Sequence, residues 1–463
     1  MRRRWLASLL ILLATTTFLS CGSSPPRTLL STRSGLVYVT TTDAPMPSVL
    51  AFQVTITGLT LSDGSESVPV LAEPAAVEFG RLLGMRTLLG LSSVTPRTYT
   101  GATLTLASPV ISFLDLSTTP ASVGTINGNL TTSSITVNLN PPLIVEEGGL
   151  AGLHLHFRLR ESMQTDASGE LTGVVDPHIG LRAIPPTDED SLIDELRGGV
   201  SAVNTAGNSF LLQTLRGRQL TVRVDAQTVW EDGESLSSLN PPAIVEVSGR
   251  VQADASILAT NVEVLSRDHF LLGGLVLDPD PPTGPADRAT LLVREEIPDL
   301  VNIQVGRTAT VEFSDQTRFG IHNLDLPLEF LLFNRAMLVR GQRVALGGAL
   351  DTSTTPATLN IRRVILHRQG FEGARVIGSV RIVSGNTGGF LLRTDGLFGY
   401  LFGEPLRVAT SHRTWFVNLR GLADLDTSEP MLVRVVGLLL RRSDTGDPVL
   451  VAYRVERLLP RIP

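Results

Sequence analysis

Apolar and polar residues alternate along most of this chain with the two-residue period of a β-strand. The clearest alternating runs span residues 49–61, 98–106, 133–139 and 153–160, and Gly, Pro or Asp residues bound them. Only residues 75–84 have a spacing that fits a short helix, and a turn crossing between two sheets is the alternative there. The pattern therefore predicts an all-β chain.

The part of the chain beyond residue 199 repeats one order of strands three times. Each unit has a strand with a Phe-Leu-Leu core, a strand closed by a threonine and an aromatic residue, a valine-rich strand that turns on glycine, and a final alternating strand. The closing threonines, Thr228, Thr317 and Thr414, lie about 90 to 100 residues apart, which exceeds solenoid periods and indicates tandem small domains. About five strands per unit suit a small OB-like or closed β-barrel.

The predicted architecture is an N-terminal β-sandwich followed by three small OB-like β-barrel units. A length of 463 residues fits about three or four domains. The expected boundaries are a signal peptide at 1–20, a tether at 21–34, the β-sandwich at 35–186, an acidic linker at 187–198, and barrel units at 199–267, 268–370 and 371–463.

The predicted sandwich contains four distinctive features: the Thr-Asp-Ala-Pro turn at residues 42–45, the Val-Thr-Ile-Thr-Gly run that opens residues 54–61, Tyr99, and the proline-containing strand at 174–181. In these features it resembles a bacterial family known as domain of unknown function 4382. It covers about a third of the chain. Arg97 and Thr98 depart from the family, which usually has a glycine there. The resemblance implies a β-sandwich in a cell-envelope context and no particular activity.

The three repeated units resemble a second bacterial family, domain of unknown function 5666, whose members often accompany the first. The first unit departs least from the shared pattern. The second carries an insertion at residues 278–289, and the third carries a glycine-rich loop at 394–405.

The first residues have the layout of a secretory signal peptide. Three arginines precede an apolar stretch at residues 5–18, which is short for a membrane span, and Cys21 follows at once. This arrangement resembles a bacterial lipobox, which implies a lipid on Cys21 that anchors the protein, and Gly22 favours the outer membrane. An ordinary signal peptide with an incidental cysteine is the alternative. Cys21 is the sole cysteine, so the domains fold without disulfides.

Composition excludes two classes of function. The formal net charge is −6 and every basic residue is an arginine, so no lysine can act as a general base or form a Schiff base. Mild acidity spread along the chain argues against nucleic acid as a partner, because nucleic-acid binding needs a concentrated basic face.

Two residue pairs are weak metal candidates, although we expect no bound metal and no cofactor. His154 and His156 lie two apart on a predicted strand and project from one face, as a zinc or copper pair would. Arginines on the same face favour a solvated strand face instead. Asp278 and Asp280 have a spacing that can bind calcium, but prolines around them favour a stiff surface loop.

No catalytic constellation is visible, since the histidines are scattered and no nucleophile elbow appears. Four aromatic residues are candidates for ligand binding, with burial in a core as the alternative: Trp230, Tyr400, Trp415 and Phe416. We therefore expect a non-catalytic, lipid-anchored envelope protein that serves as a scaffold or adhesion-type surface protein. It would contact the membrane through a lipid on Cys21. Its partner would be an envelope glycan or a surface protein. The alternative is an envelope lipoprotein that binds a glycan or calcium through barrel loops.

Overall fold

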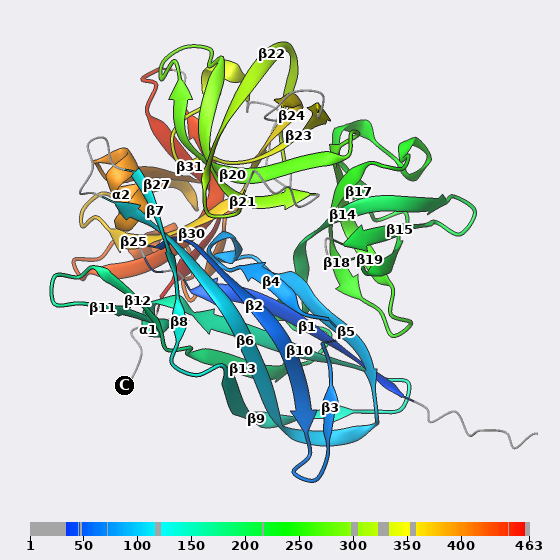
Figure 1. Ribbon diagram of the computed structural model, residues 1–463. Helices are drawn as coiled ribbons and strands as arrows, with labels where there is room; N and C mark the ends of the chain where they lie inside the picture. The colour runs from blue at the N-terminus through cyan, green and yellow to red at the C-terminus, as the bar shows by residue number, and fades with distance from the viewer. Residues whose placement is uncertain are drawn as a thin grey trace, which may run out of the picture.

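The computed structural model describes residues 34–458, apart from 45, 47–48, 72, 116–121, 215–216, 298–303, 323–332, 352–357 and 443. The predicted signal peptide, tether and Cys21 lie outside these residues. Strands dominate the described chain, and they form a sandwich followed by three barrels (Figure 1). The predicted all-β architecture is therefore confirmed. Among the described helices, none has the length and apolar character needed to cross a membrane.

The N-terminal unit is a β-sandwich. One sheet has the order β13-β10-β1-β5, and the other has the order β3-β2-β6-β7, with β4 paired to β2 and β9 to β6. A small third sheet has the order β11-β12-β8. The strands are β1 (Gly35–Ala44), β2 (Val49–Ser62), β3 (Ser67–Pro69), β4 (Ala75–Glu78), β5 (Thr87–Val94), β6 (Arg97–Asp115), β7 (Ser122–Asn127), β8 (Asn129–Leu130), β9 (Ser134–Val145), β10 (Leu150–Arg158), β11 (Met163–Thr165), β12 (Leu171–Val175) and β13 (Ile179–Ile184).

The apolar residues of the alternating strands form the core of the sandwich. Phe157 on β10 packs between Phe52 and Phe79, with ring centroids 5.1 and 4.9 Å away. The stretch at 75–84 forms a strand, β4, and then one 3₁₀ turn, η1 (Gly80–Leu82), instead of an α-helix. The reason is that β4 pairs with β2 and buries Val77 in the core. Pro45 and the side chain of Asp43, in the Thr-Asp-Ala-Pro turn, lie outside the described residues.

Each of the three repeats forms a five-stranded barrel. The first contains β14 (Ile193–Asn204), β15 (Ser209–Thr214), β16 (Gln219–Arg223), β18 (Ile244–Val251) and β19 (Ile257–Ser266). The second contains β20 (Phe270–Asp280), β21 (Arg288–Ile297), β22 (Thr308–Ile321), β23 (Arg343–Asp351) and β24 (Thr358–His367). The third contains β25 (Gln369–Arg375), β27 (Thr387–Thr394), β28 (Leu406–Thr410), β30 (Met431–Arg441) and β31 (Pro448–Arg457). Short strands β17 (Val229–Trp230), β26 (Arg381–Ser384) and β29 (Trp415–Val417) extend the first and third.

The three barrels share one strand order. In each, the first strand pairs with the second and the fourth, and the third strand pairs with the second and the fifth. The pair between the third and fifth strands is parallel in all three: β16–β19, β22–β24 and β28–β31. A small Greek-key barrel of five strands is the OB-like fold that the repeats predict.

The repeated threonine has the same structural role in each barrel. Its hydroxyl accepts the backbone N–H from three residues earlier, and donates to a carbonyl of the fifth strand. The donor and acceptor pairs are Thr228 with Ala259 (2.8 Å), Thr317 with Ile361 (2.8 Å) and Thr414 with Ala452 (2.9 Å). The threonine thus ties the segment around it to the fifth strand, which explains why the sequence repeats it. In the first and third barrels this segment follows the third strand, and in the second it lies within β22.

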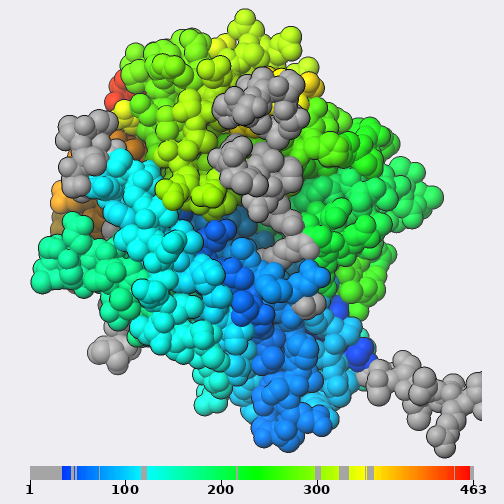
Figure 2. All heavy atoms as spheres, in the orientation of Figure 1, coloured from blue at the N-terminus to red at the C-terminus, as the bar shows by residue number. Residues whose placement is uncertain are grey.

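The units pack side by side into one body (Figure 2). One apolar core contains Tyr38 and Leu91 from the sandwich together with Ile193 from the first barrel. Another joins the second barrel to Leu438 and Leu440 of β30 in the third. Strand β14 begins at Ile193, inside the stretch expected to be a linker, and a 3₁₀ turn, η2 (Glu189–Ser191), precedes it. The units are therefore separated by very short connections.

Candidate functional site

A buried group of charged side chains lies where the sandwich, the first barrel and the second barrel meet. We call it the central charge cluster. Its carboxylates come from β14, β18, β19 and β21, and its cations from η1, β14 and β23, with two histidines from the ends of β22 and β24. The members are Arg81, Glu195, Arg197, Glu246, Glu263, Glu295, His322, Arg343 and His367.

Ion pairs within the cluster run between units. Arg343 of the second barrel donates two hydrogen bonds to Glu195 of the first, each 2.6 Å long. Arg197 binds Glu246 within its own barrel at 2.6 Å and Glu295 of the second barrel. Arg343, Glu195 and Arg197 are at most 7 % exposed, so removing one partner would leave a buried charge with fewer opposite charges around it.

Burial and pairing shift the pKa values of these carboxyls in opposite directions. Burial raises the pKa of Glu195, but Arg343 and Arg197 outweigh it and hold that pKa well below its usual range. The pKa of Glu295 is also lowered, because Arg81 and Arg197 outweigh its burial. For Glu246, burial prevails over Arg197 and the pKa is raised. Glu195 and Glu295 are thus firmly anionic partners of the arginines.

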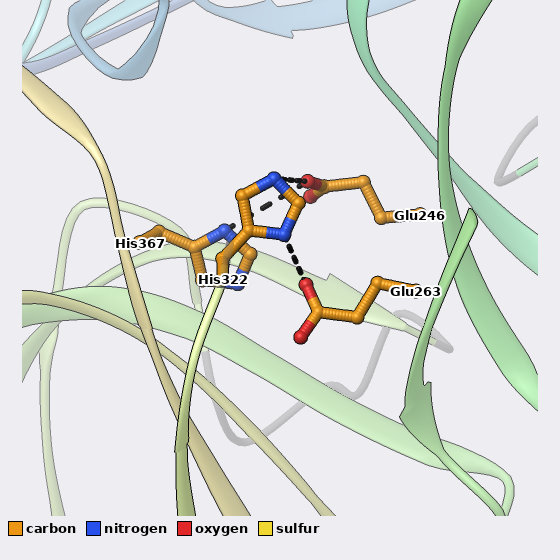
Figure 3. A group of neighbouring side chains, drawn as sticks. All are labelled: Glu246, Glu263, His322 and His367. Carbon is orange, nitrogen blue, oxygen red and sulfur yellow. Dashed lines mark hydrogen bonds and ion pairs between the residues drawn. The ribbon is translucent and has the colours of Figure 1, made fainter. Parts of the chain in front are cut away.

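One part of the cluster places two glutamates opposite two histidines (Figure 3). Glu246 on β18 and Glu263 on β19 are direct neighbours across the antiparallel pair. On the second barrel, the N–H of His322 bonds to the carbonyl of Leu366 at 2.9 Å, which sets His322 beside His367. Two like charges directly opposite on neighbouring strands destabilise a sheet, and the imidazole of His322 faces both of these carboxylates.

Distances within this group of four are short. His322 Nδ1 contacts Glu263, and its Nε2 lies 3.4 Å from Glu246 Oε1. His367 Nδ1 lies 3.8 Å from the same Oε1, and the two imidazole rings stack with centroids 4.9 Å apart. In the described structure, Glu246 Oε1 and both ring nitrogens of His367 make no hydrogen bond. Buried polar atoms without partners are rare and point to a missing one.

The pKa values of the two histidines are shifted in opposite directions. Burial lowers the pKa of His322, but the carboxylates of Glu263 and Glu246 outweigh burial and leave it above its usual value. The pKa of His367 is far below its usual value because of burial and the nearby Arg197. Two imidazoles and two carboxylates form a donor set that could hold a transition-metal ion.

The predicted histidine pair lies elsewhere. His154 and His156 project from the outer face of β10 into a polar cavity of about 530 Å³ that Arg182 and Arg454 also line. The expectation of a solvated face is wrong for His154, which is buried, because η2 and its Asp190 cover this part of the sheet. Thr40 donates to the carbonyl of Asp190 at 2.7 Å, so its hydroxyl accepts from His154 Nδ1 at 3.0 Å.

The other metal candidates carry arginine partners. Asp278 pairs with Arg340, and Asp280 pairs with Arg288 at 2.6 Å. All four side chains are half exposed. This geometry agrees with a surface role, and it offers calcium a poor site because a guanidinium already occupies each carboxylate.

The four aromatic candidates are not brought together at one cavity. Trp230 packs against the apolar core shared by the sandwich and the first barrel, and Phe416 packs against the core of the third barrel. Tyr400 and Trp415 are 49 % and 46 % exposed, so burial in a core does not describe them. The guanidinium of Arg454 lies 5.9 Å from the ring centroid of Trp415.

The glycine-rich stretch at 394–405 is not a loop over most of its length. It contains helix α2 (Gly396–Phe402), which ends at Gly403 in the left-handed conformation. Phe398 and Phe402 of this helix stack on each other and pack against Phe371. The aromatic contacts hold the helix in place despite its glycines, and only Tyr400 is left on the surface.

Sequence reasoning did not single out the group of Glu246, Glu263, His322 and His367. Its members come from two repeats, and their partners are set by the docking of the barrels. One signal was present: Glu246 and Glu263 each lie between two valines in an otherwise apolar strand. A charged residue inside such a run indicates a buried partner on another element.

A comparison with known families supports part of this description. Residues 197–263 match the family model described as domain of unknown function (DUF5666). The match confirms the predicted resemblance for the first barrel. It spans β14 to β19 and includes Arg197, Glu246 and Glu263 of the central charge cluster. No curated protein matches the chain.

Proposed function

We propose that this chain is a non-catalytic, lipid-anchored protein of the bacterial cell envelope that acts as a scaffold. The observation that carries the proposal is the central charge cluster, in which the Arg343–Glu195 pair joins two barrels. Charges that are buried and bonded to one another hold units in place and leave few groups free for chemistry. A body of fixed shape suits a scaffold or an adhesion-type surface protein, which must present its partner at a defined position.

The lipid anchor rests on Cys21, the lipobox resemblance and the polar tether behind it. The resemblance of the sandwich to domain of unknown function 4382 implies the same envelope context. Strand β1 starts at the end of the sandwich that points away from the second and third barrels (Figure 1). An anchor ahead of β1 would thus leave those barrels free to contact a partner.

Mass spectrometry of the mature N-terminus from native membranes tests the proposal, beside a Cys21→Ala variant. We expect a diacylglyceryl group on Cys21 and release of the variant into the soluble fraction. A plain cleaved N-terminus in the soluble fraction would overturn the anchor. Crosslinking on intact cells tests the scaffold role. The parent chain should crosslink reproducibly to one envelope component, and the released Cys21→Ala variant should not crosslink to it.

Binding of an envelope glycan is the second candidate, favoured by the exposed ring of Trp415. Aromatic rings at a surface can stack on sugar rings, and OB-like barrels hold oligosaccharides in known cases. Co-sedimentation with insoluble envelope polysaccharide tests it. We expect Trp415→Ala to lose most binding and Trp230→Phe, at a packed position, to keep it. Equal sedimentation of both variants would exclude Trp415 as the platform.

A further inference from the structure

Four buried side chains between the first and second barrels have the composition of a metal site. We propose that Glu246, Glu263, His322 and His367 bind one divalent transition-metal ion and so tie the two barrels together. No motif in the sequence points to a metal at these four residues. The inference goes beyond the scaffold function, since it concerns how the two barrels are joined and not where the chain is anchored.

The donor atoms are close enough to surround one ion. Each residue offers one ligand atom, and these four atoms all lie within 4.8 Å of one another. In a tetrahedral zinc site, bonds of about 2.0–2.2 Å place the ligand atoms about 3.3–3.6 Å apart. Small side-chain movements would therefore close the group around an ion. Two imidazole nitrogens favour zinc or a neighbouring transition metal over calcium and magnesium, which prefer oxygen ligands.

Unbonded atoms favour an ion over a proton as the element that holds the group together. A proton on His322 satisfies Glu263, yet it leaves Glu246 Oε1 and both nitrogens of His367 without a hydrogen bond. Glu246 and His367 are about 1 % exposed, so these atoms do not face bulk solvent. A bound ion would contact all four side chains at once, and would give Glu246 Oε1 and one ring nitrogen of His367 a partner.

The surroundings orient the ligands as outer-shell residues do in metal sites. Arg197 donates to Oε2 of Glu246 at 2.6 Å, which turns Oε1 toward the imidazoles. Such partners fix the direction of a ligand and raise the affinity of the site. A cavity of about 460 Å³ is lined by Arg197 and Glu295, so it borders the central charge cluster.

Cobalt titration of the full chain tests the proposal. The protein should carry Cys21→Ala and no histidine tag, so that neither a thiolate nor a tag competes for the ion. We expect one Co²⁺ per chain with visible absorption bands typical of four-coordinate cobalt, and displacement by Zn²⁺. Absence of a bound ion at one equivalent, with the fold intact by circular dichroism, would overturn the proposal.

Variants locate the ion. We expect His367→Gln and His322→Gln each to weaken Co²⁺ binding at least about 100-fold, because loss of a ligand exceeds the 10- to 100-fold cost of losing an outer-shell partner. His154→Gln, the matched control at a buried histidine of the sandwich, should bind as the parent chain does. Unchanged binding by both cluster variants would place the ion elsewhere and overturn the assignment.

X-ray absorption of the zinc-loaded parent chain decides the question if the cluster variants fail to fold. Two imidazole and two oxygen ligands are the expected shell. A shell without imidazole would contradict the proposal whatever the variants do.

Discussion

The first barrel has two interfaces of different composition. Against the sandwich it shares a large apolar core that contains Leu91, Tyr38 and Ile193, and the same interface also holds the ion pair of Arg86 with Asp194 at 2.9 Å. Against the second barrel it buries the central charge cluster, with Glu195 bonded to Arg343, beside a small apolar cluster around Leu271. Burial of apolar surface is non-directional, whereas hydrogen bonds between paired charges need their donors and acceptors in a defined arrangement. We infer that the sandwich interface supplies stability and the barrel interface supplies a defined geometry.

Arg343→Met should have the largest effect. It removes the two hydrogen bonds to Glu195 and leaves that carboxylate buried, which costs about 3–5 kcal/mol. Urea denaturation of the chain and the variant measures the change. Arg340→Met is the matched control three residues away, where the pair with Asp278 is exposed and should contribute about 1 kcal/mol or less. Equal effects of the two substitutions would contradict the special role of the buried pair.

Leu91→Ala tests the apolar side of the comparison. Its side chain is buried in the core shared by sandwich and barrel, and truncation should cost about 2–5 kcal/mol. Unlike the charged interface, this loss should not depend on salt concentration. Leu432→Ala, at an exposed position, should change stability by about 0.5 kcal/mol or less. A strong salt dependence for Leu91→Ala would show that the two interfaces are not distinct.

His154 should make the stability of the sandwich sensitive to acid. Burial is the main cause that lowers its pKa to about 4, with Asp190 opposing and Arg182 and Arg86 adding to the shift. In the unfolded chain this pKa is near 6.5, so as pH falls from about 6.5 to about 4 the unfolded chain takes up the proton first and stability is lost, by at most roughly 3 kcal/mol. His154→Gln should flatten this part of the profile of unfolding free energy against pH. Parallel profiles for both proteins would refute a buried neutral histidine.

The barrels could be predicted from the sequence because each is specified locally. Alternation defines the strands, and Thr228 with its two equivalents marks the same turn in each unit. Helix α2 was not predicted, because its glycines have low helix propensity and outweigh the helical spacing of Phe398 and Phe402. Both rings pack against Phe371, a tertiary contact that the local sequence does not show.

Docking between units could not be predicted in the same way. Glu246 contacts His322 only after the two barrels have folded and packed together. The sequence around either residue contains no feature that predicts the other as its partner. The burial of His154 has the same origin, since the side chain that covers it belongs to η2, beyond the last strand of the sandwich. Sequence alternation thus specifies each fold, and contacts between folds create the candidate site.

A double-mutant cycle across Glu195 and Arg343 tests most directly whether the buried charges lock the barrels in one arrangement. The cycle compares the unfolding free energies of the parent chain, Glu195→Gln, Arg343→Met and the double variant. We expect each single substitution to cost several kcal/mol and the double to cost clearly less than their sum, with a coupling of at least about 2 kcal/mol. Costs that add to within about 0.5 kcal/mol would show that the two residues act independently, and would contradict the account.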